Sequence, residues 1–112
     1  MNVDLIQTVL AQYDLPDVRS TFLGRSENTT FRVETATNER FLLRLHVGID
    51  IGSYQDWRDP SVIQSELLWL DAIAHDTPLT VPQPVQNRLG QWITHLDTED
   101  SSIACSLLRW VE

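Results

Sequence analysis

Two charged side chains in apolar surroundings constrain this chain most. Arg44 interrupts the aliphatic stretch 41–45, which has the composition of a strand. Glu66 lies beside the apolar stripe of a predicted helix, where Ile63 and Leu70 border it at helical neighbour spacings. Either charge would be costly to bury alone, whereas the two together could satisfy one another. The sequence therefore predicts a strand and a helix that meet at an Arg44–Glu66 pair.

Three strands in succession are predicted before that helix. Residues 18–25 alternate like a strand, residues 29–35 are rich in β-branched side chains, and residues 41–47 are mostly aliphatic. The segments between them, 24–28 and 36–39, have the composition of tight turns. Two short connections in a row predict an antiparallel meander.

The third of these strands is divided sharply by the alternation of its side chains between two faces. One face is fully apolar and the other carries the charge, with Leu42, Arg44 and His46. His46 thus shares a face with Arg44. A histidine in such a position is more often partly buried in the sheet than a catalyst, and we expect the former here.

Apolar residues at helical spacing predict two helices. The first covers residues 4–13 and is a short packing helix that ends before Pro16. The second has Asp59 as its N-cap and Pro60 at its first position, and runs to about His75. Its predicted core stripe consists of Ile63, Leu67, Leu70 and Ala74.

The last part of the chain predicts three more strands. Residues 85–87 and 91–96 are predicted to pair as a hairpin across residues 88–90. Residues 102–111 form a near-continuous apolar run, which is typical of an interior strand. The predicted fold class is therefore α+β, an antiparallel sheet of five or more strands with one main helix packed on it. We expect a single domain over residues 1–112.

Composition argues against several classes of partner and chemistry. The formal net charge of −8 argues against nucleic acid and anionic membranes as partners. The chain contains arginine but no lysine, so it cannot provide a Schiff base or a phosphate-binding lysine. There is no apolar run long enough to span a bilayer, and the start lacks the features of a secretory signal. We therefore expect a cytoplasmic protein.

Three groups of residues could be mistaken for binding sites. Cys105 lies in an apolar stretch and is expected to be a core residue, and one cysteine with three scattered histidines lacks the spacing of a zinc site. Asp97, Glu99 and Asp100 lack the pattern of a calcium loop and are expected to form a solvated turn. The tryptophans are expected to pack in the core or at a lobe interface: Trp57, Trp69, Trp92 and Trp110.

The order of these elements resembles the N-terminal lobe of the aminoglycoside phosphotransferase and choline kinase family, which has a protein-kinase-like fold and includes type II homoserine kinase-like proteins. Residues 24–33 resemble the family's nucleotide-covering hairpin, residues 41–46 its third strand, and residues 65–70 the middle of its helix C. Residues 81–85 resemble the segment before its fourth strand, and residues 107–112 the fifth strand where it reaches the hinge. The resemblance covers nearly the whole chain.

The resemblance implies nucleotide-binding roles at named positions. Residues 24–30 would lie over the ATP phosphates with their backbone amides toward the anion. Arg44 would replace the strand lysine that contacts the phosphates, Glu66 would pair with it, and residues 110–112 would border the adenine pocket. From the residues alone, a structural ion pair or two unrelated surface charges remain alternatives. The residues implied to bind the nucleotide are Gly24, Ser26, Asn28, Thr29, Arg44, Glu66, Trp110 and Glu112.

The function that the resemblance implies is that of the ATP-binding lobe of a small-molecule phosphotransferase, which transfers the ATP γ-phosphoryl group to a hydroxyl with Mg²⁺. The family's catalytic and metal-binding residues lie in a C-terminal lobe that this sequence does not include, so we expect this chain alone to be inactive. Two features depart from the family pattern: an arginine stands where lysine is frequent, and the covering hairpin has one glycine.

The predicted partners are a nucleotide and, in the whole enzyme, a small-molecule acceptor. The isolated lobe is also expected to self-associate through the apolar surface on which the second lobe would dock. A rival interpretation is a non-catalytic module of similar α+β layout, in which the sheet edge or an apolar face recruits a protein partner.

Overall fold

A mixed α+β architecture is seen in the computed structural model, which describes residues 3–25, 28–46, 60–97 and 102–111. Its described strands form one six-stranded sheet in which every pairing is antiparallel. The strand order is β1-β2-β3-β6-β4, and β5 also pairs with β6. The strands are β1 (Val18–Arg25), β2 (Thr29–Thr35), β3 (Arg40–Leu45), β4 (Pro84–Val85), β5 (Ile93–Asp97) and β6 (Ser102–Arg109). The predicted fold class and the meander β1-β2-β3 are confirmed.

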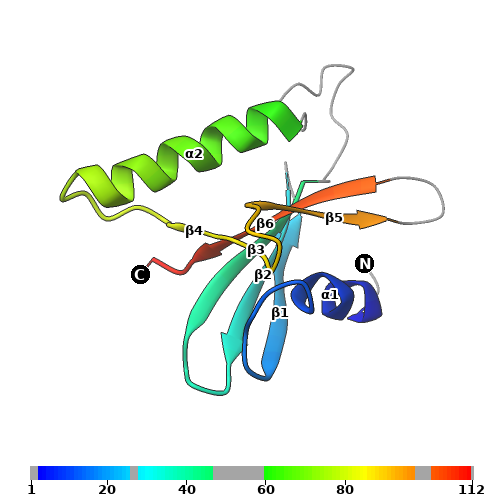
Figure 1. Cartoon of the computed structure of the whole chain (residues 1–112). Helices are drawn as coiled ribbons and strands as arrows, with labels where there is room; N and C mark the ends of the chain where they lie inside the picture. Colours follow the sequence, from blue (N-terminus) through cyan, green and yellow to red (C-terminus); the bar gives the residue numbers. More distant parts are fainter. Residues whose placement is uncertain (1–2, 26–27, 47–59, 98–101, 112) are drawn as a thin grey trace.

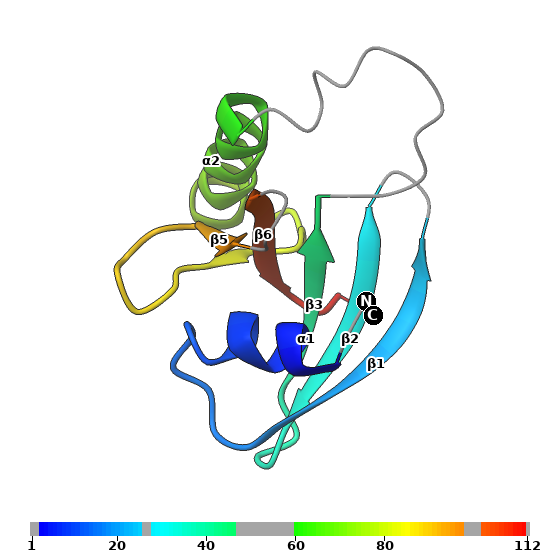
Figure 2. The ribbon, with the colours of Figure 1, turned by 90° about the vertical axis from the view of Figure 1, so that its right-hand side faces the viewer.

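The two described helices, α1 (Val3–Leu10) and α2 (Pro60–Asp76), cover opposite faces of this sheet (Figures 1 and 2). Consecutive residues of β6 contribute to the two opposite faces, because Cys105 packs on the α1 side and Ala104 on the α2 side. The α1 core consists of Ile6, Val9, Leu10, Tyr13, Phe31, Val33, Phe41, Leu43, Leu45, Leu96, Cys105 and Leu107. The smaller α2 core consists of Ile63, Leu67, Ile93, Ala104 and Leu108, with Leu70 and Trp92 packed against it.

The third strand has the predicted two-faced character. Phe41, Leu43 and Leu45 are buried in the α1 core. Arg44 lies on the opposite face, toward α2, and the strand ends at Leu45. The expectation that His46 is at least partly buried is also confirmed, since it is only 7% exposed. Val47 lies outside the residues that the structure describes.

The predicted hairpin of residues 85–87 and 91–96 is wrong. Its two arms do not pair with each other as strands. Instead, β4 pairs with Leu107 and Leu108, while β5 pairs with residues 102–106, so both lie along the same edge of β6. Residues 86–92 form a loop between them. The tight turn itself is present, because Gly90 adopts a positive φ of 76° and its N–H donates to the Asn87 carbonyl.

This loop is fixed to the end of α1 by a chain of buried polar groups. The Asn87 amide nitrogen donates to Thr94 Oγ1 at 3.0 Å, and Thr94 Oγ1 donates to the Tyr13 hydroxyl at 2.9 Å. The backbone N–H of Arg88 donates to the Gln12 carbonyl at 2.8 Å. Burial raises the pKa of Tyr13 to about 12, so its hydroxyl stays neutral. The first helix is therefore connected to the far edge of the sheet.

The second helix matches its prediction in length and in the residues it buries. Ile63 and Leu67 are fully buried, and Leu70 and Ala74 are partly buried. Trp69, however, is 66% exposed, so it does not pack in the core of the described structure. Neither of the described helices is long and apolar enough to cross a membrane.

Candidate functional site

One row of residues across the sheet contains two of the predicted nucleotide-binding positions, Gly24 and Arg44. The strand registers pair Gly24 with Thr30, Thr30 with Arg44, and Arg44 with Ser106. Directly paired residues of antiparallel strands direct their side chains to the same face of the sheet. Thr30, Arg44 and Ser106 therefore share the face that α2 covers. The row runs through four adjacent strands, from β1 to β6.

Arg44 and Glu66 form the predicted pair between strand and helix. The Arg44 Nη2–Glu66 Oε1 distance is 2.9 Å and the Nη1–Oε2 distance is 3.3 Å, so the guanidinium binds both carboxylate oxygens. The Arg44 side chain is only 14% exposed, whereas that of Glu66 is 46% exposed. The pair therefore lies at the border between the α2 core and solvent.

The Arg44 guanidinium retains hydrogen-bonding capacity beyond this pair. Arginine has five N–H donors. Within the described residues, one N–H of each terminal nitrogen binds Glu66, and Nε–H donates to Ser106 Oγ at 3.2 Å. This leaves two N–H groups on the terminal nitrogens. The arrangement can hold an additional anion while Glu66 keeps the guanidinium in place.

His46 contacts the same serine as Arg44, and its Nε2 is 2.9 Å from Ser106 Oγ. The pKa of His46 is lowered to about 4, chiefly by burial and then by the nearby Arg44 charge, against a smaller opposing effect of Glu66. The imidazole is therefore neutral at pH 7. Ser106 is fully buried between the two side chains and was missed in the sequence. Its only signal in the sequence is that it is a polar residue within an apolar strand. Its position opposite Arg44 follows from the strand register.

The last residues of β1 and the first residues of β2 lie at the Arg44 end of the sheet. Thr29 is buried, and Thr30 Oγ1 donates to the Gly24 carbonyl at 3.4 Å. A β-bulge separates Phe22 from Gly24, and a Cβ added at Gly24 would meet nothing within 4 Å. The backbone of this strand is thus open to a close approach. The structure describes Asn28 but not Ser26.

Trp110 lies toward the opposite end of the sheet from Gly24. It follows β6, and its backbone N–H donates to the Arg40 carbonyl at 3.1 Å. Trp110 is roughly 13 Å along the strand direction from Ser106, since each strand residue advances about 3.3 Å. It therefore does not join the Arg44 cluster. Glu112 lies outside the described residues.

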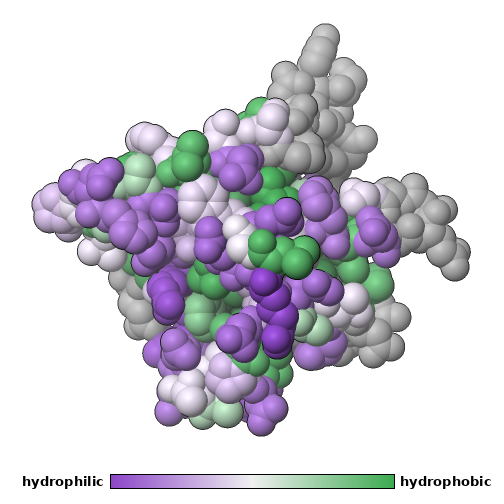
Figure 3. All heavy atoms as spheres, viewed as in Figure 1, coloured by the Kyte–Doolittle hydropathy of each residue, from purple (hydrophilic) through white to green (hydrophobic). Residues whose placement is uncertain are grey.

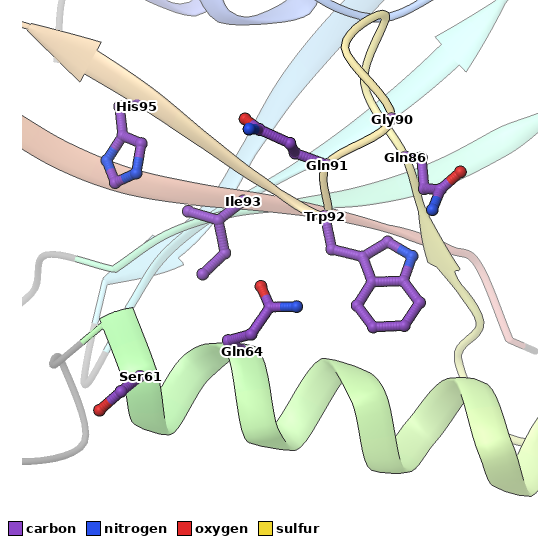
Figure 4. Close-up of a pocket in the computed structure, with 8 residues that line it drawn as sticks. All are labelled: Ser61, Gln64, Gln86, Gly90, Gln91, Trp92, Ile93 and His95. Carbon is purple, nitrogen blue, oxygen red and sulfur yellow. The ribbon is translucent and has the colours of Figure 1, made fainter.

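A separate cavity of about 510 Å³ lies between α2, β5 and the loop 86–92 (Figure 4). Trp92 and the amide side chains of Gln64 and Gln91 line it, with Ile93 at its base. No residue implied to bind the nucleotide lines this cavity. Its neutral amide lining also does not suit phosphate, so we place the candidate site at Arg44, where the guanidinium lies.

The remaining candidates for chemistry are inert. Burial raises the pKa of Cys105 to about 12, so this residue is a protonated core thiol and not a nucleophile. Among the described residues, no three His, Cys, Asp or Glu side chains are grouped so that they could hold a metal ion.

Comparison with solved structures identifies proteins with the same architecture. A microcompartment-associated aminopropanol kinase aligns with 98% of this chain at a TM-score of 0.77 and 32% sequence identity. The amicoumacin kinase hAmiN, solved in complex with AMP-PNP, Ca²⁺ and Ami, aligns with 99% of this chain at a TM-score of 0.77 and 13% identity. No protein-family model and no curated protein sequence matches. The chain spans 32% and 31% of the length of the two kinases.

Proposed function

Because this chain has the fold of the N-terminal lobe of the aminoglycoside phosphotransferase-like kinases, we propose that it is the ATP-binding lobe of a small-molecule phosphotransferase. The observation that carries the proposal is the Arg44–Glu66 pair, at 2.9 Å, in the same cross-sheet row as Gly24 near the end of β1. ATP would supply the phosphoryl group, and a hydroxyl of the acceptor would receive it.

The residues present fit a nucleotide along the α2 side of the sheet. Arg44 would bind phosphate oxygens with its two remaining N–H groups, while Glu66 would fix the guanidinium. Gly24 would allow the β1–β2 backbone to approach the phosphates, with Asn28 beside it. Thr29 pairs with Leu45 and directs its side chain to the α1 face, so only its backbone would take part. Trp110 would lie near the base, roughly 13 Å along the strand direction from Ser106. Glu112 and Ser26 are proposed for the same site on the resemblance alone.

Catalysis would depend on residues outside this chain. In the proposed enzyme, Mg²⁺ and the acceptor would be held by a second lobe, and the present chain would position the phosphates. We therefore propose that the chain alone binds nucleotide without transferring phosphate. A cytoplasmic location is part of the same proposal.

Removing the guanidinium should weaken the binding of ATP and leave that of adenosine unchanged. We expect Arg44→Ala to weaken ATP binding about ten- to a hundredfold, which corresponds to the loss of hydrogen bonds to a charged group. Isothermal titration calorimetry with ATP and with adenosine measures both affinities. Arg19→Ala removes an equal charge from an exposed position of β1 and serves as the control. Equal ATP affinity in the wild type and Arg44→Ala would contradict the proposed site.

A second candidate function, a protein-interaction module, is favoured by the outer face of α2. Leu68 is 59% exposed and Trp69 is 66% exposed on this face. In Figure 3 the hydrophobic residues over α2 form small separate patches among hydrophilic ones, so the contact they could make is limited in area. We propose that this face mediates association of two copies of the chain.

The double substitution Leu68→Gln and Trp69→Gln should therefore weaken self-association by about tenfold or more, as expected for an exposed tryptophan at the centre of an interface. Light scattering over a concentration series measures the dissociation constant. Leu79→Gln, at a position 63% exposed beyond the helix, is the control. A wild-type chain that stays monomeric at high concentration would count against the contact.

A further inference from the structure

Ser106 connects two side chains that the sequence placed on one face of β3. Its hydroxyl oxygen is 3.2 Å from Arg44 Nε and 2.9 Å from His46 Nε2. Ser106 is fully buried, and His46 is only 7% exposed. A buried hydroxyl with two polar neighbours is a fixed point of the structure, because its partners cannot be replaced by water without opening the core.

The direction of these hydrogen bonds follows from the chemistry of the three groups. Arg44 Nε–H can only donate, so Ser106 Oγ accepts from it. The single hydroxyl hydrogen of Ser106 then needs an acceptor, which His46 Nε2 provides when the ring proton is on Nδ1. The lowered pKa of His46 supports this neutral form. In the other tautomer both neighbours would donate to Ser106, and its own hydrogen would lack this acceptor.

We propose that Ser106 and His46 are positioning residues for Arg44: the imidazole orients the serine hydroxyl, and the hydroxyl fixes the Nε side of the guanidinium. Glu66 holds the other end, at the two terminal nitrogens. The side chain is thus fixed at two points, on β6 and on α2, before any ligand arrives. The two remaining N–H groups then have defined directions.

The consequence for binding rests on the proposed nucleotide function. An arginine that is already ordered loses less conformational freedom when it binds an anion, and so binds it more tightly. The contact with Ser106 on the sheet also holds the Nε side of Arg44 without any contribution from α2. If α2 moved away, Glu66 would leave the guanidinium, whereas Ser106 would still hold Nε on the sheet.

The orientation of Arg44 can be measured without any ligand. In Ser106→Ala, exchange of the Arg44 Nε–H with water, followed by nitrogen-15 NMR of the arginine side chains, should become about tenfold faster than in the wild type, because a net hydrogen bond is lost. Ser65→Ala is the matched control, since the Ser65 hydroxyl donates to the Ser61 carbonyl on the exposed side of α2. Unchanged exchange in Ser106→Ala would overturn the proposal.

A pair of substitutions at His46 tests the orienting step and replaces Ser106→Ala if that variant does not fold. Glutamine has a carbonyl oxygen that can take the place of Nε2 as acceptor, whereas leucine has none. His46→Gln should therefore keep the slow exchange of the wild type, and His46→Leu should lose it to the same extent as Ser106→Ala. Equal exchange in the two His46 variants would overturn the role of the imidazole.

Nucleotide titration separates this proposal from the proposed function. Ser106→Ala should weaken ATP binding about three- to tenfold and leave adenosine binding unchanged. If Arg44→Ala weakens ATP binding but Ser106→Ala does not, the site stands and the positioning of Arg44 for phosphate is wrong. If neither substitution weakens ATP binding, the proposed nucleotide site is wrong. The measurement of Arg44 Nε–H exchange then decides alone whether Ser106 fixes Arg44.

Discussion

Replacing Leu67 by alanine should lower the free energy of unfolding by about 3 kcal/mol, the usual cost of removing a buried leucine side chain. Leu67 is fully buried in the α2 core, together with Ile63 and the sheet residues Ile93 and Leu108. This core is small, so the neighbours cannot fill the space left by a leucine without moving the helix. Urea denaturation followed by circular dichroism measures the change.

The next residue provides a matched control for this prediction. Leu68 is 59% exposed, so Leu68→Ala makes the same chemical change on the same helix and should alter the unfolding free energy by about 0.5 kcal/mol or less. Equal losses in the two variants would show that α2 does not dock through Leu67. Because Glu66 precedes Leu67 on the helix, Leu67→Ala should also loosen the Arg44–Glu66 pair.

The Arg44–Glu66 pair could be predicted because both signals are local. A cation within an aliphatic strand and a carboxylate beside an apolar helical stripe are visible in single windows of the sequence, and burying either one alone is unfavourable. The meander β1-β2-β3 was predictable for a similar reason. Its connections are short, so each strand pairs with its neighbour in sequence.

The pairing of β4 and of β5 with β6, instead of with each other, could not be predicted in this way. The turn around Gly90 is a local signal and was located correctly, but a turn does not determine which strand its flanking residues pair with. The long apolar strand β6 offered a free edge to both segments, with the loop 86–92 between them. Val85 pairs with Leu107 and Pro84 with Leu108, and no short window of the sequence contains both partners of these pairs.

Ser106 and the exposure of Trp69 were missed for a related reason. A serine within an apolar strand matches no functional motif, and it gains its role only from the register that places it opposite Arg44. Trp69 is apolar and lies on a helix, which favours burial, but the α2 stripe that faces the sheet does not include it. Exposure thus depends on which side of the helix the sheet occupies.

Acidification should destabilise the chain through His46. Its pKa is about 4 in the folded chain and 6.5 as the unperturbed value, so between these values the unfolded chain binds a proton that the folded chain does not. The stability contributed by the neutral imidazole is therefore complete above pH 6.5 and is lost as the pH falls toward 4. We expect a loss of roughly 2–3 kcal/mol over this range.

A comparison with His46→Gln isolates this effect from the titration of the carboxylates. Glutamine can keep the contact with Ser106 but does not titrate, so the difference in unfolding free energy between the two proteins should change with pH only between 6.5 and 4. The charged groups that face His46, Arg44 and Glu66, are present in both proteins. The exposed His75 has a raised pKa and acts in the opposite direction, but equally in both. Parallel stability curves for the two proteins would mean that His46 accepts its proton as readily in the folded chain as in the unfolded one, and that Ser106 does not face a neutral ring.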